Sequence, residues 1–131
     1  MNRTTFRKIP FIIWMTIITV LSVIPHADDG IVVSTNVTSS GMEKHIAGYF
    51  LAALLCYYAY MNKESGLGVH DIGYRKDVFL SGLFIFLYSV ALEAVQFFLP
   101  YRTFNVYDIV ANGIGVVAFV FVWMLFISHP G

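Results

Sequence analysis

Residues 93–115 read EAVQFFLPYRTFNVYDIVANGIG, an apolar run that stops at Pro100, a short polar connection, and the start of a second apolar run. Proline lacks the backbone amide that a helix interior needs, so Pro100 is expected to end the first of the two helices. A charge near the middle of a bilayer costs about 2.5–3.5 kcal/mol, so polar residues in such stretches usually face the protein interior. The stretch therefore predicts a helical membrane hairpin with a polar site built from Glu93, Gln96, Arg102, Asp108 and Asn112.

The composition of the whole chain is that of an integral membrane protein. Of its 131 residues, 58% are hydrophobic and 12% are charged. Runs that approach the roughly 20 apolar residues needed to cross a bilayer predict an all-α membrane protein, a bundle of four transmembrane helices in one domain spanning residues 1–131. The expected helices cover residues 9–25, 42–61, 78–99 and 109–127. Eight basic residues balance eight acidic ones, so we expect no nucleic-acid partner.

The distribution of lysine and arginine predicts the orientation of the chain. Six of the eight lie in the N-terminal segment or between residues 62 and 77, and the other two are Lys44 and Arg102. By the positive-inside rule both termini are cytoplasmic, which places the polar set at the outer surface. The first apolar run also fits a cleaved signal peptide, but Pro25 occupies a position where cleavage requires a small residue.

Helical spacing predicts that the polar side chains converge in one outward-facing pocket. Glu93 and Gln96 are three residues apart, and Asp108 and Asn112 are four apart, so each pair shares a helix face. At 1.5 Å per residue, Glu93 lies about 10 Å below Pro100, inside the outer leaflet, where its carboxyl must be protonated or paired. His45 and Tyr49 are one turn apart on the second helix and are expected to face the same pocket.

The residue types in this pocket predict acid–base chemistry and anion binding. Glu93 and His45 are the candidate general acid or base. The Arg102 guanidinium has the forked geometry that holds phosphate or carboxylate. The remaining candidates for ligand binding are Gln96, Asp108, Asn112 and Tyr49. One histidine among scattered carboxylates lacks the paired spacing of zinc motifs, so no metal or cofactor is expected.

Each of these residues also has a purely structural interpretation. Asp108 fits a helix cap, in a capping arrangement with Asn105 three residues before it, or a partner for Arg102. Gln96 and Asn112 fit interhelical hydrogen bonds, a common use of amides in membranes. Small residues indicate close helix contacts at Gly48 with Ala52 and at Gly113 with Gly115. Tyrosines 57, 58 and 60 are typical of an interfacial aromatic belt, and Cys56, the only cysteine, is expected to be a small buried hydrophobe.

Three motifs together resemble the VanZ-like family of small bacterial membrane proteins. They are His45-x-x-x-Tyr49, Glu93-x-x-Gln96-x-x-x-Pro100-x-Arg102, and Asp108-x-x-x-Asn112-x-x-Gly115. Family members often carry an acidic residue and a lysine three or four positions before the histidine, where this chain has Gly41 and Met42. The resemblance implies a four-helix, multi-pass protein of the bacterial inner membrane that acts at the cell envelope in resistance to glycopeptide antibiotics such as teicoplanin. It implies no particular reaction.

Three functional hypotheses follow from these residues. In the first, the pocket binds or modulates an anionic membrane lipid, a lipid-linked envelope precursor or another peptidoglycan-related component, with Arg102 holding the anion. In the second, the protein is an intramembrane hydrolase or transferase that uses Glu93 or His45 as general acid or base. In the third, the polar cluster only locks the four helices together. The oligomeric state does not follow from the sequence.

Overall fold

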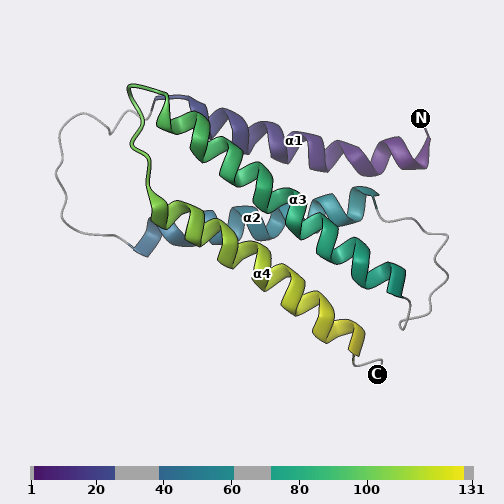
Figure 1. Cartoon of the computed structure of the whole chain (residues 1–131). Helices are drawn as coiled ribbons and strands as arrows, with labels where there is room; N and C mark the ends of the chain where they lie inside the picture. Colours follow the sequence, from purple (N-terminus) through teal and green to yellow (C-terminus); the bar gives the residue numbers. More distant parts are fainter. Residues whose placement is uncertain (1, 26–38, 61–71, 129–131) are drawn as a thin grey trace.

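The computed structural model describes residues 2–25, 39–60 and 72–128, which form four α-helices (Figure 1). They are α1 (Arg3–Val23), α2 (Ser39–Tyr60), α3 (Ile72–Phe97) and α4 (Val106–Ser128). The described ranges contain no β-strand. The all-α class and the four helices predicted from the sequence are therefore confirmed. Lys63, which supports the predicted orientation, lies outside the described residues.

The helices begin three to six residues before the apolar runs that predict them. α1 starts at Arg3 rather than at residue 9, and α3 starts at Ile72 rather than at residue 78. A run of apolar residues predicts only the part of a helix that is removed from water. The backbone hydrogen bonds of the helix continue through the charged residues on either side. α3 ends at Phe97, and the amides of Phe98 and Leu99 still bond to carbonyls three residues back before Pro100 interrupts the pattern.

The four helices run antiparallel to their sequence neighbours, so both termini lie at the same end of the bundle (Figure 1). We call this the Tyr60 end, because α2 finishes there at Tyr60. The opposite end, where α2 and α4 start and α1 and α3 finish, we call the His45 end. All the predicted site residues belong to the His45 end. Which side of the membrane each end occupies rests on the charge distribution and stays a prediction.

Three of the helices are long and apolar enough to cross a membrane: α1, α3 from Arg75 and α4 up to Phe126. The N-terminal part of α2 carries Glu43, Lys44 and His45, which lower its mean hydropathy. α2 packs against all three other helices, so much of its surface faces protein rather than lipid. A helix in that position needs less apolar surface, and its role as a fourth span stays a prediction.

Gly115 of α4 lies directly against the backbone of α2. A Cβ placed there would lie against the backbone carbonyl of Ile46 and 3.1 Å from the amide nitrogen of Phe50. Gly48, by contrast, has nothing within 4 Å of its Cβ position, although its carbonyl accepts a hydrogen bond from the Trp14 indole. The predicted close contact at Gly115 is thus present, and on α2 the small side chains that are fully enclosed are Ala52 and Ala53.

Candidate functional site

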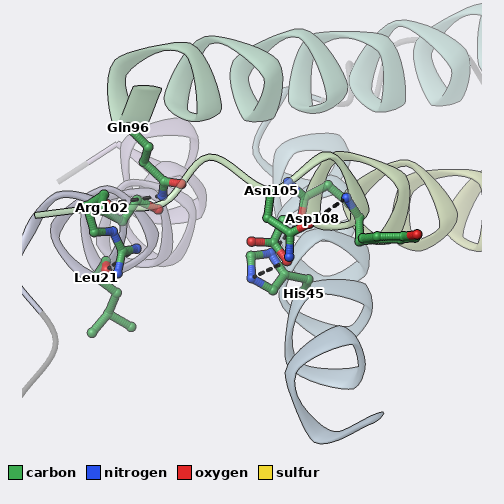
Figure 2. Close-up of polar contacts among 9 residues, drawn as sticks. Leu21, His45, Gln96, Arg102, Asn105 and Asp108 are labelled. Atoms are coloured by element: carbon green, nitrogen blue, oxygen red, sulfur yellow. Dashed lines mark hydrogen bonds and ion pairs between the residues drawn. The ribbon is translucent and has the colours of Figure 1, made fainter. Parts of the chain in front are cut away.

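The site residues come from the last turns of α3, the connection to α4 and the first turns of α2 and α4 (Figure 2). Because α2 and α4 both begin at the His45 end, their first turns lie side by side, and α3 delivers its last turns to the same end. The hydrogen bonds there form two groups. One surrounds the His45 ring, and the other surrounds the last turn of α1.

His45 is held between two side chains of α4 (Figure 2). Its Nδ1 lies 2.8 Å from Oδ1 of Asn112, and its Nε2 lies 3.8 Å from Oδ1 of Asp108. An amide oxygen can only accept, so Nδ1 carries the hydrogen and donates it to Asn112. Nε2 is then the nitrogen that faces the Asp108 carboxylate, and protonation of Nε2 completes an ion pair. The Tyr49 ring, one turn along α2, lies nearly parallel to the imidazole at 10°, with the centroids 6.5 Å apart.

The start of α4 places Asp108 in this position. Asn105 precedes the first helical residue, and its Oδ1 accepts a hydrogen bond from the amide of Tyr107 at 3.0 Å, which is the geometry of an N-cap. Of the two residues in the predicted capping arrangement, Asn105 is the one that caps α4. Asp108 follows in the first turn, where a carboxylate is favoured by the helix dipole, and its side chain points to His45 (Figure 2).

The second group of hydrogen bonds ends α1. Nε2 of Gln96 donates to the carbonyl of Ser22 at 3.1 Å, the Tyr101 hydroxyl donates to that of Val23 at 2.9 Å, and Nη2 of Arg102 donates to that of Leu21 at 3.4 Å. The last carbonyls of a helix have no partner within the helix and carry partial negative charge. Gln96, Tyr101 and Arg102 therefore supply hydrogen bonds to carbonyls at the end of α1 that have no partner within the helix.

Glu93 lies inside the bundle, with only 2% of its surface exposed. Its Oε2 is buried and has no hydrogen-bond partner among the residues that the structure describes. The carboxyl interacts electrostatically with Asp108, His45 and Arg102. Glu93 therefore lies within reach of both hydrogen-bonded groups. A buried carboxyl oxygen without a donor is costly, so a proton or a donor from a bound molecule has to satisfy it.

Asn112 has a second unsatisfied atom at the same end. Its side chain is fully enclosed, and while Oδ1 accepts from His45, Nδ2 has no partner within the described ranges. Native proteins leave few buried polar atoms unpaired, and those that remain call for an explanation such as a bound molecule or a catalytic role.

The structure brings the predicted residues to one end, but it divides them between two sets of contacts. His45, Tyr49, Asp108 and Asn112 form the first set, Gln96 and Arg102 belong to the second, and Glu93 lies within electrostatic reach of both. Sequence reasoning missed Tyr101, because a side chain that binds a backbone carbonyl leaves no spacing pattern. Its position beside Arg102 is the one signal that pointed to it. The described residues contain no group of three or more histidine, cysteine, aspartate or glutamate side chains that could hold a metal ion.

Residues 9–127 match the family model described as VanZ/LLP1, a range that contains every residue of the site. The chain belongs to the VanZ/LLP1 family. The family resemblance stated from the motifs is thereby confirmed, and together with the three long apolar helices it makes this chain a multi-pass membrane protein of the VanZ/LLP1 family. Comparison with curated proteins and with solved structures gave no match.

The geometry of this VanZ/LLP1 chain allows two kinds of chemistry at the His45 end. The imidazole, fixed at Nδ1 by Asn112 and facing a carboxylate at Nε2, is suited to holding or moving a proton. The Arg102 guanidinium is suited to binding an anion, because it has five N–H groups and makes a single hydrogen bond within the described part of the chain, to the carbonyl of Leu21. Glu93 interacts with both groups and can balance the charge of either.

Proposed function

We propose that this protein lies in the bacterial cytoplasmic membrane with both termini inside and binds an anionic envelope component at its outer surface. The ligand class is a membrane lipid or a lipid-linked or peptidoglycan-related precursor with a phosphate or carboxylate group. Binding at the His45 end would alter susceptibility to glycopeptides such as teicoplanin. The observation that carries the proposal is the half-buried Arg102, which lies within electrostatic range of the enclosed Glu93 carboxyl and whose guanidinium bonds to the Leu21 carbonyl at 3.4 Å.

The remaining N–H groups of Arg102 support anion binding. A bond of 3.4 Å to a neutral carbonyl is long, and a charged oxygen acceptor would bond more strongly. A phosphate needs a net positive surrounding, which Arg102 together with a protonated Glu93 supplies. The unpaired Oε2 of Glu93 would then carry a hydrogen that it donates to a ligand oxygen.

The charge distribution supports the orientation. Arg3, Arg7 and Lys8 lie at the start of α1, and Arg75 and Lys76 lie near the start of α3, all at the Tyr60 end. By the positive-inside rule this end faces the cytoplasm. The His45 end then faces outward, where envelope precursors are used.

The His45 contacts favour a second candidate, an intramembrane hydrolase or transferase. The Nδ1 hydrogen of His45 is bonded to Asn112, so Nε2 is the atom that can take up a proton as a general base, and the Asp108 carboxylate 3.8 Å away would stabilise the resulting imidazolium. Ser89 is not placed to be its nucleophile, because it is fully enclosed and its hydroxyl donates to the Phe86 carbonyl in the same helix. Such an enzyme would use a water molecule or a substrate hydroxyl instead.

The Arg102→Ala variant tests the main proposal. Wild type and variant are purified in mild detergent, and the lipids retained with each are identified by mass spectrometry. We expect an anionic lipid or lipid-linked precursor with wild type that is lost from Arg102→Ala and partly kept in Arg102→Lys. Arg75→Ala, which removes an exposed cation at the Tyr60 end, is the matched control and should keep the lipid. Equal retention by all four proteins would refute the proposal.

The Glu93→Gln variant separates the three hypotheses, because it keeps the shape of the side chain and a hydrogen-bond donor but cannot take up or release a proton. A binding protein in which a protonated Glu93 donates to the ligand would keep its ligand and its effect on teicoplanin susceptibility. An enzyme would keep its ligand but lose turnover. A packing module would show a change in thermal stability in detergent and nothing else.

A further inference from the structure

A cavity of about 370 Å³ lies between α2 and α3 at the Tyr60 end, away from the site described above. Cys56, Tyr57 and Tyr60 of α2 line one side, and residues of α3 line the other. Cys56 is eleven residues beyond His45 on α2, which at 1.5 Å per residue separates the two by about 16 Å. The cavity is therefore a different site. Its volume falls within the roughly 300–1,000 Å³ that is usual for ligand pockets.

The shape of this cavity fits a hydrocarbon chain that enters from the lipid. Its inner wall includes Cys56 and Ser81, both buried. Its outer lining includes Leu80 and Phe84, which are about half exposed on the surface of α3. Protein interiors are close-packed, so a space of this size next to lipid is filled by whatever apolar group can reach it. In a membrane that group is an acyl chain.

The charges at the Tyr60 end of the cavity fit a zwitterionic headgroup. Asp77, half-buried near the start of α3, is the one charged side chain among the described residues that line the cavity. The Lys8 ammonium lies 5.2 Å from the centroid of the Tyr60 ring, which also lines the cavity. A negative group thus lines the cavity, and a positive group lies against the ring of one of the lining residues. A ligand that carries a cation and an anion a few bonds apart matches both.

We propose that this cavity binds one phospholipid with a phosphoethanolamine headgroup. An acyl chain lies between α2 and α3, the primary ammonium donates hydrogen bonds to the Asp77 carboxylate, and the phosphate pairs with Lys8. A choline headgroup has no N–H to donate to Asp77. A glycerol headgroup has no cation, so its phosphate meets the Asp77 charge without compensation.

Binding of defined lipids to delipidated protein tests this proposal. Native mass spectrometry in detergent compares phosphatidylethanolamine, phosphatidylcholine and phosphatidylglycerol of the same chain length. We expect one phosphatidylethanolamine per chain, bound more tightly than the other two. Asp77→Asn should lower its affinity about two- to fivefold, the range expected for a partly exposed ion pair. Glu43→Gln, which removes an exposed carboxylate at the His45 end, should leave the affinity unchanged.

A second measurement locates the acyl chain. The chain has two tryptophans, and Trp123 contacts Tyr57 of the cavity wall with ring centroids 5.3 Å apart. In a Trp14→Phe background, a phosphatidylethanolamine with brominated chains should quench Trp123. Ser81→Leu, which fills the cavity, should reduce the quenching, whereas Ser81→Ala should preserve it.

The proposal is overturned if the three lipids bind with equal affinity and Asp77→Asn has no effect on that affinity. It is also overturned if the brominated lipid quenches Trp123 equally in Ser81→Leu and Ser81→Ala. Loss of phosphatidylethanolamine in Arg102→Ala but not in Asp77→Asn would also overturn it, because the lipid would then occupy the His45 end.

Discussion

Gly115→Ala tests whether the contact between α2 and α4 sets the geometry of the site. The added methyl group would lie against the Ile46 carbonyl and 3.1 Å from the amide nitrogen of Phe50. Both neighbours are backbone atoms, which cannot rotate away as a side chain can, so the two helices have to separate. His45 directly precedes Ile46, and Asn112 lies almost one turn before Gly115. Separation at Gly115 therefore stretches the bond of 2.8 Å between His45 and Asn112.

The size of the effect follows from a comparison with Gly48→Ala. Both variants gain the same helix propensity, about 1 kcal/mol for alanine over glycine, so this contribution cancels in the difference. A methyl group forced into a packed contact costs about 1–3 kcal/mol, whereas the Cβ position of Gly48 has nothing within 4 Å. We expect Gly115→Ala to be less stable than Gly48→Ala by about 1–3 kcal/mol, near the upper value because its neighbours are backbone.

Reversible unfolding in mixed micelles, followed by circular dichroism, measures this difference. Nitrogen NMR of the histidine rings reports the hydrogen bond at Nδ1 of His45, which should weaken in Gly115→Ala and stay as in wild type in Gly48→Ala. Equal stabilities and equal His45 spectra in the two variants would refute the argument that this glycine holds the site together.

Two further predictions concern the hydrogen bonds at the His45 end. Tyr101→Phe removes the bond to the Val23 carbonyl and should cost about 0.5–1.5 kcal/mol of unfolding free energy, whereas Tyr107→Phe, at an exposed side chain, should cost less. Asn105→Ala removes the cap of α4 and should cost about 0.5–2 kcal/mol, while Asn105→Asp, another good cap, should keep most of the stability. If Tyr107→Phe lowered the unfolding free energy as much as Tyr101→Phe, the role of the Tyr101 hydrogen bond would be contradicted. If Asn105→Ala and Asn105→Asp were equally stable, the role of Asn105 as the cap would be contradicted.

The sequence predicts the parts of this fold that depend on local pattern. Apolar runs locate four helices, and a side chain three residues before Asp108 is recognisable as the cap of α4. Helical spacing also pairs His45 with Tyr49 and Asp108 with Asn112. These relations hold within one helix, so they do not depend on how the helices are packed.

Relations between helices were predicted less well. Arg102 was expected to face a carboxylate or a ligand, but the structure gives it the Leu21 carbonyl, and backbone carbonyls are present at every position of a sequence. Tyr57, expected in an interfacial belt with Tyr60, packs instead against Phe119 and Trp123. The three tyrosines of this belt lie within about one helical turn, so composition does not distinguish them, and the rotation of α2 decides which one enters the core.

The hydrogen bonds from the end of α3 and the α3–α4 connection to the last turn of α1 link this helix to ligand binding. Three side chains from residues 96–102 donate hydrogen bonds to the final carbonyls of α1. One of these donors is the Arg102 guanidinium, which we propose binds the anion. A ligand that draws Arg102 toward itself takes that donor away from Leu21 and leaves Gln96 and Tyr101 to retain the helix. Ligand binding at the His45 end would thus loosen the last turn of α1, and this helix could transmit the change to the Tyr60 end of the bundle.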